Sequence, residues 1–189
     1  LLYIRSIVFV LYAAIRQVLP GVRLKIMYGI SIGLYCELEG LGHPITDSEV
    51  FAIKDEMVEL IQADFPFVKK GVPTGDAVEL FRSQGLENKA LLFSQQGDLF
   101  SYVKLLGDAA NYFYGHLLPS TGYIKNYGLK AHYDGILVKI PKRRDFSKLR
   151  RVVMQDKLFE VFQEHKDWAE ILNVSNIGNL NRNIEEGKG

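Results

Sequence analysis

The sequence has few of the groups that form covalent cross-links or metal clusters. Its 189 residues include a single cysteine, Cys36, which excludes an intrachain disulfide and any site built from several cysteines. One free thiol is typical of a protein from a reducing compartment. Cys36 lies in the alternating segment LYCELE with no base nearby. We therefore predict a half-buried strand residue and not a nucleophile.

The chain also lacks an excess of charge of either sign. Its formal net charge is +1, so no global field attracts nucleic acid or an acidic membrane, and polyanion binding would need a local patch. One candidate patch is a cluster of six cations: Lys142, Arg143, Arg144, Lys148, Arg150 and Arg151. These side chains could meet phosphates, although a run of this kind at the start of a helix more often forms a solvated face.

Long uninterrupted apolar runs are absent as well. The most apolar stretch, LLYIRSIVFVLYAAIRQVLPG, is broken by Arg5 and closed by Arg16, and so falls short of the ~18 apolar residues that a membrane-spanning helix needs. We predict a core helix, buried nearly all round, that ends at Pro20 and Gly21. We expect a cytoplasmic protein with no membrane partner. Because the chain starts at Leu1 and not at Met, we also expect it to be part of a longer protein.

A hydrophobic content of 48% is enough for a real core. The segments VRLKIMY and ISIGLYCELEG alternate as strands do, with Gly29 between them. Thr46 and Glu49 form a capping-box pattern ahead of an amphipathic run that Pro66 ends. The buried stripe predicted for that helix consists of Val50, Ile53, Met57, Leu60 and Ile61.

The rest of the chain mixes strands and helices without strict alternation. FVKKGV predicts a short strand, residues 74–83 and 88–93 predict helices, and residues 99–119 show no clear pattern. YIKNYGL and YDGILVKIP predict two strands that pair, and residues 146–172 predict a long amphipathic helix. The expected class is therefore α+β, an antiparallel sheet with packed helices and a long C-terminal helix. The expected domains are a module at 1–141, a helical extension at 142–175 and a linker at 176–189.

One string of this sequence is specific. Pro-Ser-Thr-Gly-x-Ile-Lys occupies residues 119–125 within FYGHLLPSTGYIK, after the segments LPGVRLKI, GLYCELE and PITDSEVFAIKDEMVEL. In this order the segments resemble the second additional domain of threonyl-tRNA synthetases, the module that carries the editing site. The resemblance runs from about Arg5 to Pro141 and implies the fold of that domain.

The residues that depart from this family are informative. In the family, two helix histidines, a cysteine and a later histidine line a pocket that holds a metal or orders a hydrolytic water. The matching positions here are Arg5, Phe9, Phe113 and Leu117. Phe and Leu have neither a lone pair for a metal nor a titratable proton, and arginine stays protonated. We therefore predict a degenerate pocket with no catalytic residue, metal or cofactor. His116 stands one residue before the family's histidine position, so we predict a structural role for it.

A second resemblance concerns the whole protein. RS-x-x-F near the start, GLYCEL, FYGHLLPSTGYI, and FEVFQEHKDW followed by NVSNIGNLN resemble the N-terminal regions of bacterial uridine kinase-like proteins of the phosphoribulokinase/uridine kinase family. In those proteins a P-loop kinase domain follows. This sequence contains no Gly-x-x-x-x-Gly-Lys-(Ser/Thr) string. The resemblance thus implies an accessory module whose partner is a downstream kinase domain, which would use ATP and Mg to phosphorylate a nucleoside such as uridine.

Three readings of the pocket stay open. It could bind a small molecule, with Arg5, Tyr114, His116 and Lys125 as candidate ligand-binding residues. It could be a rebuilt aminoacyl-tRNA deacylase site that uses His116 and Tyr114 with His132 or Asp134, which would need the cluster at 142–151 as a groove for tRNA. Or the module could be an RNA-binding regulator that uses the same cluster and four tyrosines: Tyr112, Tyr123, Tyr127 and Tyr133.

Overall fold

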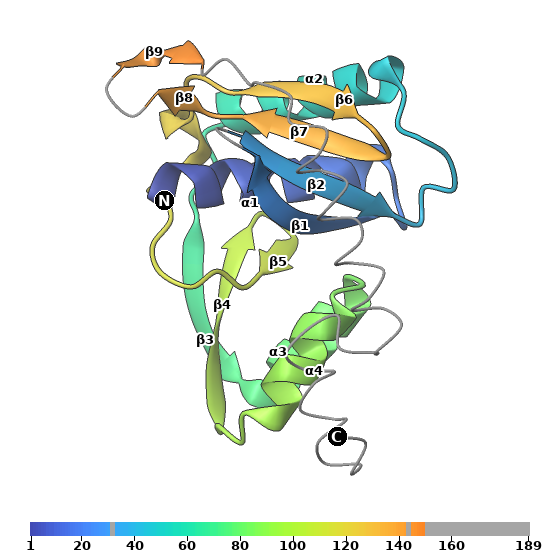
Figure 1. Ribbon diagram of the computed structural model, residues 1–189. Coiled ribbons are helices and arrows are strands. Elements are labelled where there is room, and N and C mark those ends of the chain that lie inside the picture. Colours follow the sequence, from blue (N-terminus) through green and yellow to red (C-terminus); the bar gives the residue numbers. More distant parts are fainter. Residues whose placement is uncertain (31–32, 143–144, 150–189) are drawn as a thin grey trace. The chain divides into compact units, whose positions relative to one another are not determined.

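A computed structural model describes residues 1–30, 33–142 and 145–149 (Figure 1). The chain divides into two compact units. The first contains residues 1–70 and the described residues from 102 onward, and the described part of the second is residues 71–101. Helices and antiparallel sheets make up the described residues, so the predicted α+β class is confirmed.

Helix α1 (Leu2–Val18) runs through the core of the first unit. Ten consecutive residues, 6–15, are buried, because the helix is apolar on all sides between Arg5 and Arg16. The predicted core helix is therefore confirmed, and it ends just before Pro20. No helix in the described part of the chain is both long and apolar enough to cross a membrane.

A four-stranded antiparallel sheet has the order β1-β2-β7-β6. Its strands are β1 (Arg23–Ile30), β2 (Gly33–Glu39), β6 (Gly128–His132) and β7 (Gly135–Lys139). The two central strands are the most buried, and β7 is covered on both faces, since the consecutive residues Ile136, Leu137 and Val138 are all buried. Gly29 does not separate the first two strands as expected; it lies within β1 and pairs with Leu34. The strand expected in YIKNYGL begins only at Gly128.

Helix α2 (Asp47–Gln62) begins at the predicted capping box. The backbone N–H of Thr46 donates to Glu49 Oε2 at 2.8 Å, and the backbone N–H of Glu49 donates to Thr46 Oγ1 at 3.3 Å. Val50, Ile53 and Met57 are buried, as the spacing predicted, whereas Leu60 and Ile61 of the predicted stripe are only partly buried. Helices α1 and α2 pack against each other, and Figure 1 shows both behind the four-stranded sheet.

The part of the sequence without a clear pattern contains two strands, β4 (Phe100–Leu106) and β5 (Ala109–Asn111). They follow β3 (Val68–Pro73) in a three-stranded sheet of order β3-β4-β5. In the second unit, α3 (Thr74–Ser83) and α4 (Glu87–Gln95) pack through the rings of Phe81 and Phe93, whose centroids lie 5.1 Å apart. Both helices were predicted from the sequence.

One expectation near the C-terminal end needs correction. Strand β8 (Pro141–Lys142) pairs with β9 (Asp145–Leu149), so the long helix expected from Phe146 does not begin there. Phe146 and Leu149 are separated by the helical spacing of three residues, but antiparallel pairing with β8 determines the local conformation. The remainder of the expected helix and the expected linker at 176–189 lie outside the described residues.

Candidate functional site

The two α1 positions that match the family's helix histidines, Arg5 and Phe9, are one turn apart. Phe9 is fully buried. Its ring centroid lies 5.2 Å from that of Phe113, which stands at the family's cysteine position, and 5.8 Å from that of Phe67. Two of the four pocket positions are thus in direct contact, and a third ring packs against them. The three rings form one aromatic cluster at these positions.

Arg5 lies against the loop that connects β5 to the Pro-Ser-Thr-Gly string. A Cβ atom on Gly115 would fall 2.6 Å from Arg5 Nη1, so the guanidinium rests on the bare backbone of that glycine. Gly115 has a φ of +91°, a conformation that side chains rarely adopt. Within the described ranges, the Arg5 side chain makes no hydrogen bond or ion pair. The guanidinium is therefore held in place without an acidic partner.

The other candidate ligand residues are dispersed. Tyr114 and His116 are exposed on the same loop, and His116 makes no hydrogen bond, ion pair or ring contact with any residue that the structure describes. His132 is buried at the end of β6, where its ring centroid lies 5.7 Å from that of Tyr35 and 4.5 Å from that of Tyr133. Among the described residues, therefore, none orients the His116 ring as the partner of a general base does.

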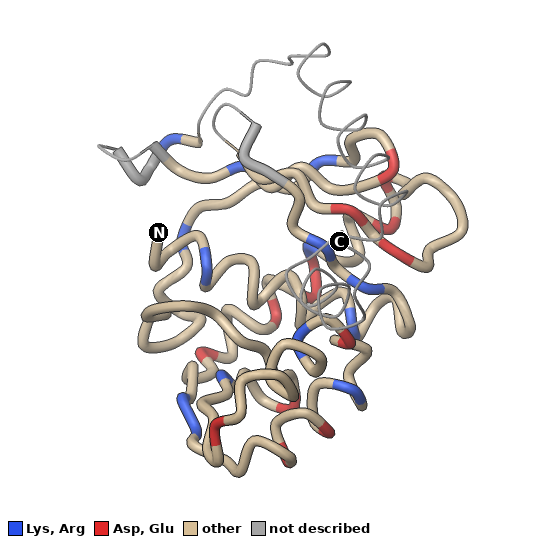
Figure 2. The backbone as a smooth tube through the Cα atoms, turned by 60° about the horizontal axis from the view of Figure 1, so that its bottom comes forward, with Lys and Arg blue, Asp and Glu red and all other residues tan. Residues whose placement is uncertain are grey.

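Lys125 does not lie with the other candidate ligand-binding residues. It lines a shallow depression with Asp64, Gly122 and Tyr123, and not with Arg5. Of the candidate polyanion patch, Lys142 lies in β8 and Lys148 is exposed in β9, whereas Arg143, Arg144, Arg150 and Arg151 lie outside the described residues. Figure 2 shows lysines and arginines interspersed with acidic residues along the described backbone.

The Pro-Ser-Thr-Gly string has a structural role that its sequence did not reveal. Asp64, just after α2, has a φ of +52° and accepts two hydrogen bonds through Oδ1, one from the Ser120 hydroxyl and one from the Gly122 N–H at 2.9 Å. These two hydrogen bonds, in that order of importance, hold the pKa of Asp64 below its usual value. The Thr121 hydroxyl donates to the Leu60 carbonyl at 2.7 Å. The string thus binds the C-terminal end of α2.

Helix α1 binds the same loop through two hydroxyl groups. The fully buried Ser6 accepts from the Leu118 N–H at 2.9 Å and donates to the Leu2 carbonyl at 3.1 Å. The Tyr3 hydroxyl accepts from the N–H groups of Lys125 and Asn126 at 3.0 and 2.9 Å and donates to the Asn126 carbonyl at 3.1 Å. Neither residue formed a recognisable motif, because each acts on a partner more than a hundred residues away.

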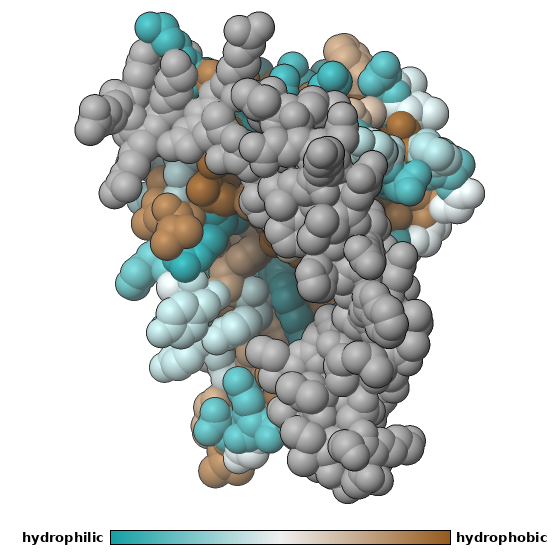
Figure 3. Space-filling model, in the orientation of Figure 1, coloured by the Kyte–Doolittle hydropathy of each residue, from teal (hydrophilic) through white to brown (hydrophobic). Residues whose placement is uncertain are grey.

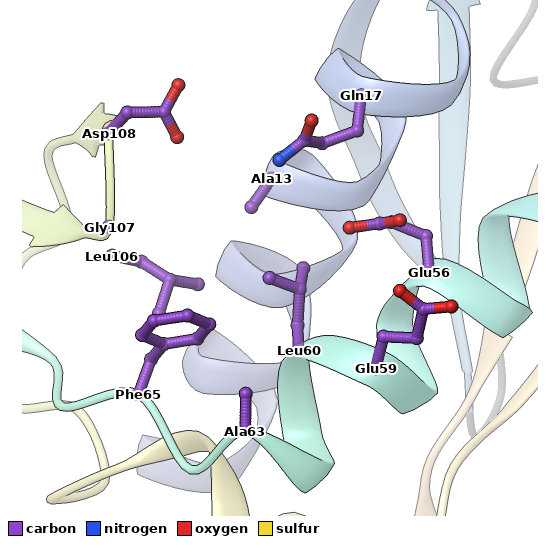
Figure 4. A pocket seen from close by; sticks show the side chains of 10 residues that line it. All are labelled: Ala13, Gln17, Glu56, Glu59, Leu60, Ala63, Phe65, Leu106, Gly107 and Asp108. Carbon is purple, nitrogen blue, oxygen red and sulfur yellow. The ribbon is translucent and has the colours of Figure 1, made fainter.

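A cavity of about 330 Å³ lies elsewhere on α1 (Figure 4). Its lining combines an apolar floor with three carboxylates, and consists of Ala13, Gln17, Glu56, Glu59, Leu60, Ala63, Phe65, Leu106, Gly107 and Asp108. Asp108 Oδ2 lies 3.8 Å from Arg16 Nη1. No cluster of three or more potential metal-binding side chains occurs in the described ranges. This cavity thus offers acidic side chains but neither a nucleophile nor a metal site.

In Figure 3, hydrophobic side chains are scattered among hydrophilic ones over the coloured part of the face in view. The loop at 113–117, with the guanidinium beside it and the aromatic cluster beneath, is therefore the candidate functional site. It is also the place where the motif resemblance puts the editing pocket.

Comparisons with known proteins find relatives for part of this chain. No protein-family model matches the chain. A segment of 118 residues is 28% identical to the threonine–tRNA ligase of Geobacter sp. (strain M21), covering 62% of this chain and 18% of that protein. The corresponding enzyme of Syntrophomonas wolfei is 29% identical over 126 residues, or 65% of this chain and 19% of the enzyme. That of Polynucleobacter asymbioticus is 30% identical over 119 residues, or 61% and 18%.

These matches support the resemblance to threonyl-tRNA synthetases. The chain contains a module similar to the editing domain of threonyl-tRNA synthetases, with an α+β fold. It spans about a fifth of the length of the relatives it matches. The names of these relatives describe the relatives only.

Proposed function

We propose that this chain is a non-catalytic accessory module whose editing-type pocket has been filled with hydrocarbon. The observation that carries the proposal is the contact between Phe9 and Phe113, two positions where the family has a histidine and a cysteine, at a centroid distance of 5.2 Å. Phe67 stacks on the same ring of Phe9. Neither a proton acceptor nor a metal ligand is present at these positions.

The loop that carries the pocket is anchored to two helices of the fold. Ser6 binds its backbone at Leu118, and Asp64 binds it at Ser120 and Gly122. A fold can persist when the reacting side chains of its site are replaced. A module with this fold but without those side chains would suit an accessory role. The parent protein in this proposal is uridine kinase-like, with a downstream domain in the same chain that uses ATP and Mg to phosphorylate a nucleoside. We place it in the cytoplasm, which the single buried thiol of Cys36 supports.

The catalytic part of the proposal is tested by hydrolysis. The 189-residue chain is incubated with seryl-tRNA and with threonyl-tRNA, and deacylation is followed against a buffer control. We expect no acceleration with either substrate. Hydrolysis that is lost in His116→Ala would contradict the proposal and support a rebuilt deacylase site.

The kinase part is tested on the parent gene and protein. We expect the coding sequence downstream of Gly189 to encode a P-loop followed by a helix. We further expect ATP-dependent phosphorylation of uridine by the parent protein with and without this module. A class II synthetase core downstream would contradict the kinase part and leave the non-catalytic part standing.

A further inference from the structure

The loop beside Arg5 carries a row of unused hydrogen-bond donors. The backbone N–H groups of residues 114–117 make no hydrogen bond with any part of the chain that the structure describes. The next N–H, that of Leu118, is bound by Ser6. The loop is therefore anchored at one end of this row and leaves four consecutive donors free.

The backbone changes handedness once within this row of donors. Gly115 has a φ of +91°, whereas its neighbours Tyr114 and His116 do not share the positive φ. A residue of left-handed conformation next to a right-handed one can gather successive N–H groups into a nest, which binds anions. Residues 114–116 are exposed, so a ligand can reach their N–H groups.

Arg5 adds a full positive charge to the same loop. Its guanidinium lies on Gly115, close enough that a Cβ there would fall 2.6 Å from Nη1. It has five N–H donors and no acidic partner among the described residues. By contrast Arg16, three turns further along α1, lies 3.8 Å from Asp108 and over the ring of Tyr12. Arg5 is thus a cation placed beside a row of free amides.

We propose that Arg5 and the N–H groups of the 114–117 loop form an oxyanion site, which binds the terminal phosphate or carboxylate of a small ligand. A guanidinium fork matches both groups in geometry and charge. The inference deepens the proposed function, since it rests on a pocket that binds without hydrolysing. Histidine at position 5 would not serve this purpose as well, because it lacks the fork and the permanent charge.

The test is a titration of the ¹⁵N-labelled 189-residue chain, followed by its amide spectrum. Inorganic phosphate is added in one series and acetate in another, with chloride at equal ionic strength as reference. We expect saturable shifts of the amide signals of residues 114–117. The phosphate and carboxylate series identify which of the two groups the site prefers.

Two variants connect the shifts to the guanidinium. Arg5→Gln should weaken binding at least about tenfold, since a charge-assisted hydrogen bond contributes about 1.5–3 kcal/mol. Arg16→Gln removes a cation from the same helix and should bind as the unmodified chain does. Arg5→Lys keeps the charge without the fork and should bind with intermediate affinity. The amide spectrum itself reports whether each variant is folded.

Two results would contradict the proposed oxyanion site. An absence of shifts at millimolar phosphate and acetate would show that the loop does not bind oxyanions. Equal shifts in Arg5→Gln and the unmodified chain would show an adventitious ion only. Neither result affects the deacylation assay, whereas hydrolysis of seryl-tRNA would remove the proposed function and leave the binding result intact.

Discussion

The Ser6 hydroxyl accepts a hydrogen bond from the Leu118 backbone N–H at 2.9 Å, joining α1 to a loop 112 residues later in the chain. Each partner is adjacent to a position where the family has a pocket histidine, Arg5 on one side and Leu117 on the other. The hydrogen bond involves the backbone of the loop and a buried hydroxyl of the helix. It therefore fixes the loop to α1 whichever side chains the neighbouring positions carry.

Replacing Ser6 should destabilise this frame. In Ser6→Ala the Leu118 N–H loses its partner, which costs about 1–3 kcal/mol in the free energy of unfolding for a buried donor. Urea denaturation measures this loss, and amide hydrogen exchange should show faster exchange at Leu118. Ser94 donates locally to the Leu91 carbonyl on an exposed face, so Ser94→Ala is the control and should change stability by under about 0.5 kcal/mol. Equal effects of the two changes would refute the role given to Ser6.

Phe9 should contribute strongly to stability, because its buried ring packs against two other aromatic rings. Phe9→Ala removes a fully buried side chain that contacts Phe67 and Phe113, and should cost about 3–5 kcal/mol. Denaturant unfolding of variant and parent provides the measurement. Phe51, which is 65% exposed on α2, is the matched control and should tolerate alanine with little loss. A small effect at Phe9 would mean that the site is loosely filled.

Asp64 should make stability depend on pH. Its pKa is lowered in the folded state by the Ser120 and Gly122 hydrogen bonds, so the stabilisation is present at neutral pH, above the pKa of the unfolded chain. It should be lost as the pH falls through the folded-state value. At pH 7 we expect Asp64→Ala to have a lower urea midpoint of unfolding than the unmodified chain. This difference in midpoint should become smaller below about pH 4. As the control, Asp98→Ala should have the same urea midpoint as the unmodified chain at both pH values. If the difference for Asp64→Ala did not change with pH, the stabilisation would not come from the charged Asp64 carboxylate.

Gly135 should not tolerate any side chain. A Cβ there would lie 2.2 Å from the backbone oxygen of Cys36 in the neighbouring central strand, and backbone cannot move aside as a flexible side chain can. Gly135→Ala should therefore destabilise the first unit by about 1–3 kcal/mol, measured by thermal or urea unfolding. Gly75 in α3 has open space around its Cβ position and no positive φ, so Gly75→Ala should be neutral or slightly stabilising.

Cys36 should be unreactive in the folded protein. It lies in a strand as predicted but is fully buried and not half-buried, because its strand is central in the sheet. Loss of solvation raises the pKa of its thiol to about 12, so almost no thiolate exists at neutral pH. A colorimetric thiol reagent should react slowly with the native chain and rapidly in denaturant. The measurement is unambiguous because the chain has no other cysteine. Fast reaction under native conditions would show that β2 opens readily.

Local sequence signals determined much of the fold. The capping box at Thr46 and Glu49 predicts the start of α2, because its hydrogen bonds join residues three apart. The apolar run between Arg5 and Arg16 predicts the core helix for a similar reason. Strand β9 was missed, since helical spacing and strand alternation are hard to distinguish over five residues and its partner β8 determines the outcome.

For the site, the sequence by itself determined which groups are missing. The motif resemblance predicts that Arg5, Phe9, Phe113 and Leu117 stand at the family's reacting positions, and that none of them is histidine or cysteine can be read without coordinates. Only the tertiary structure decided how the space is used, because the contact of Phe9 with Phe113 and the approach of Arg5 to Gly115 each join residues more than a hundred positions apart. Such contacts arise from packing and leave no local pattern in the sequence.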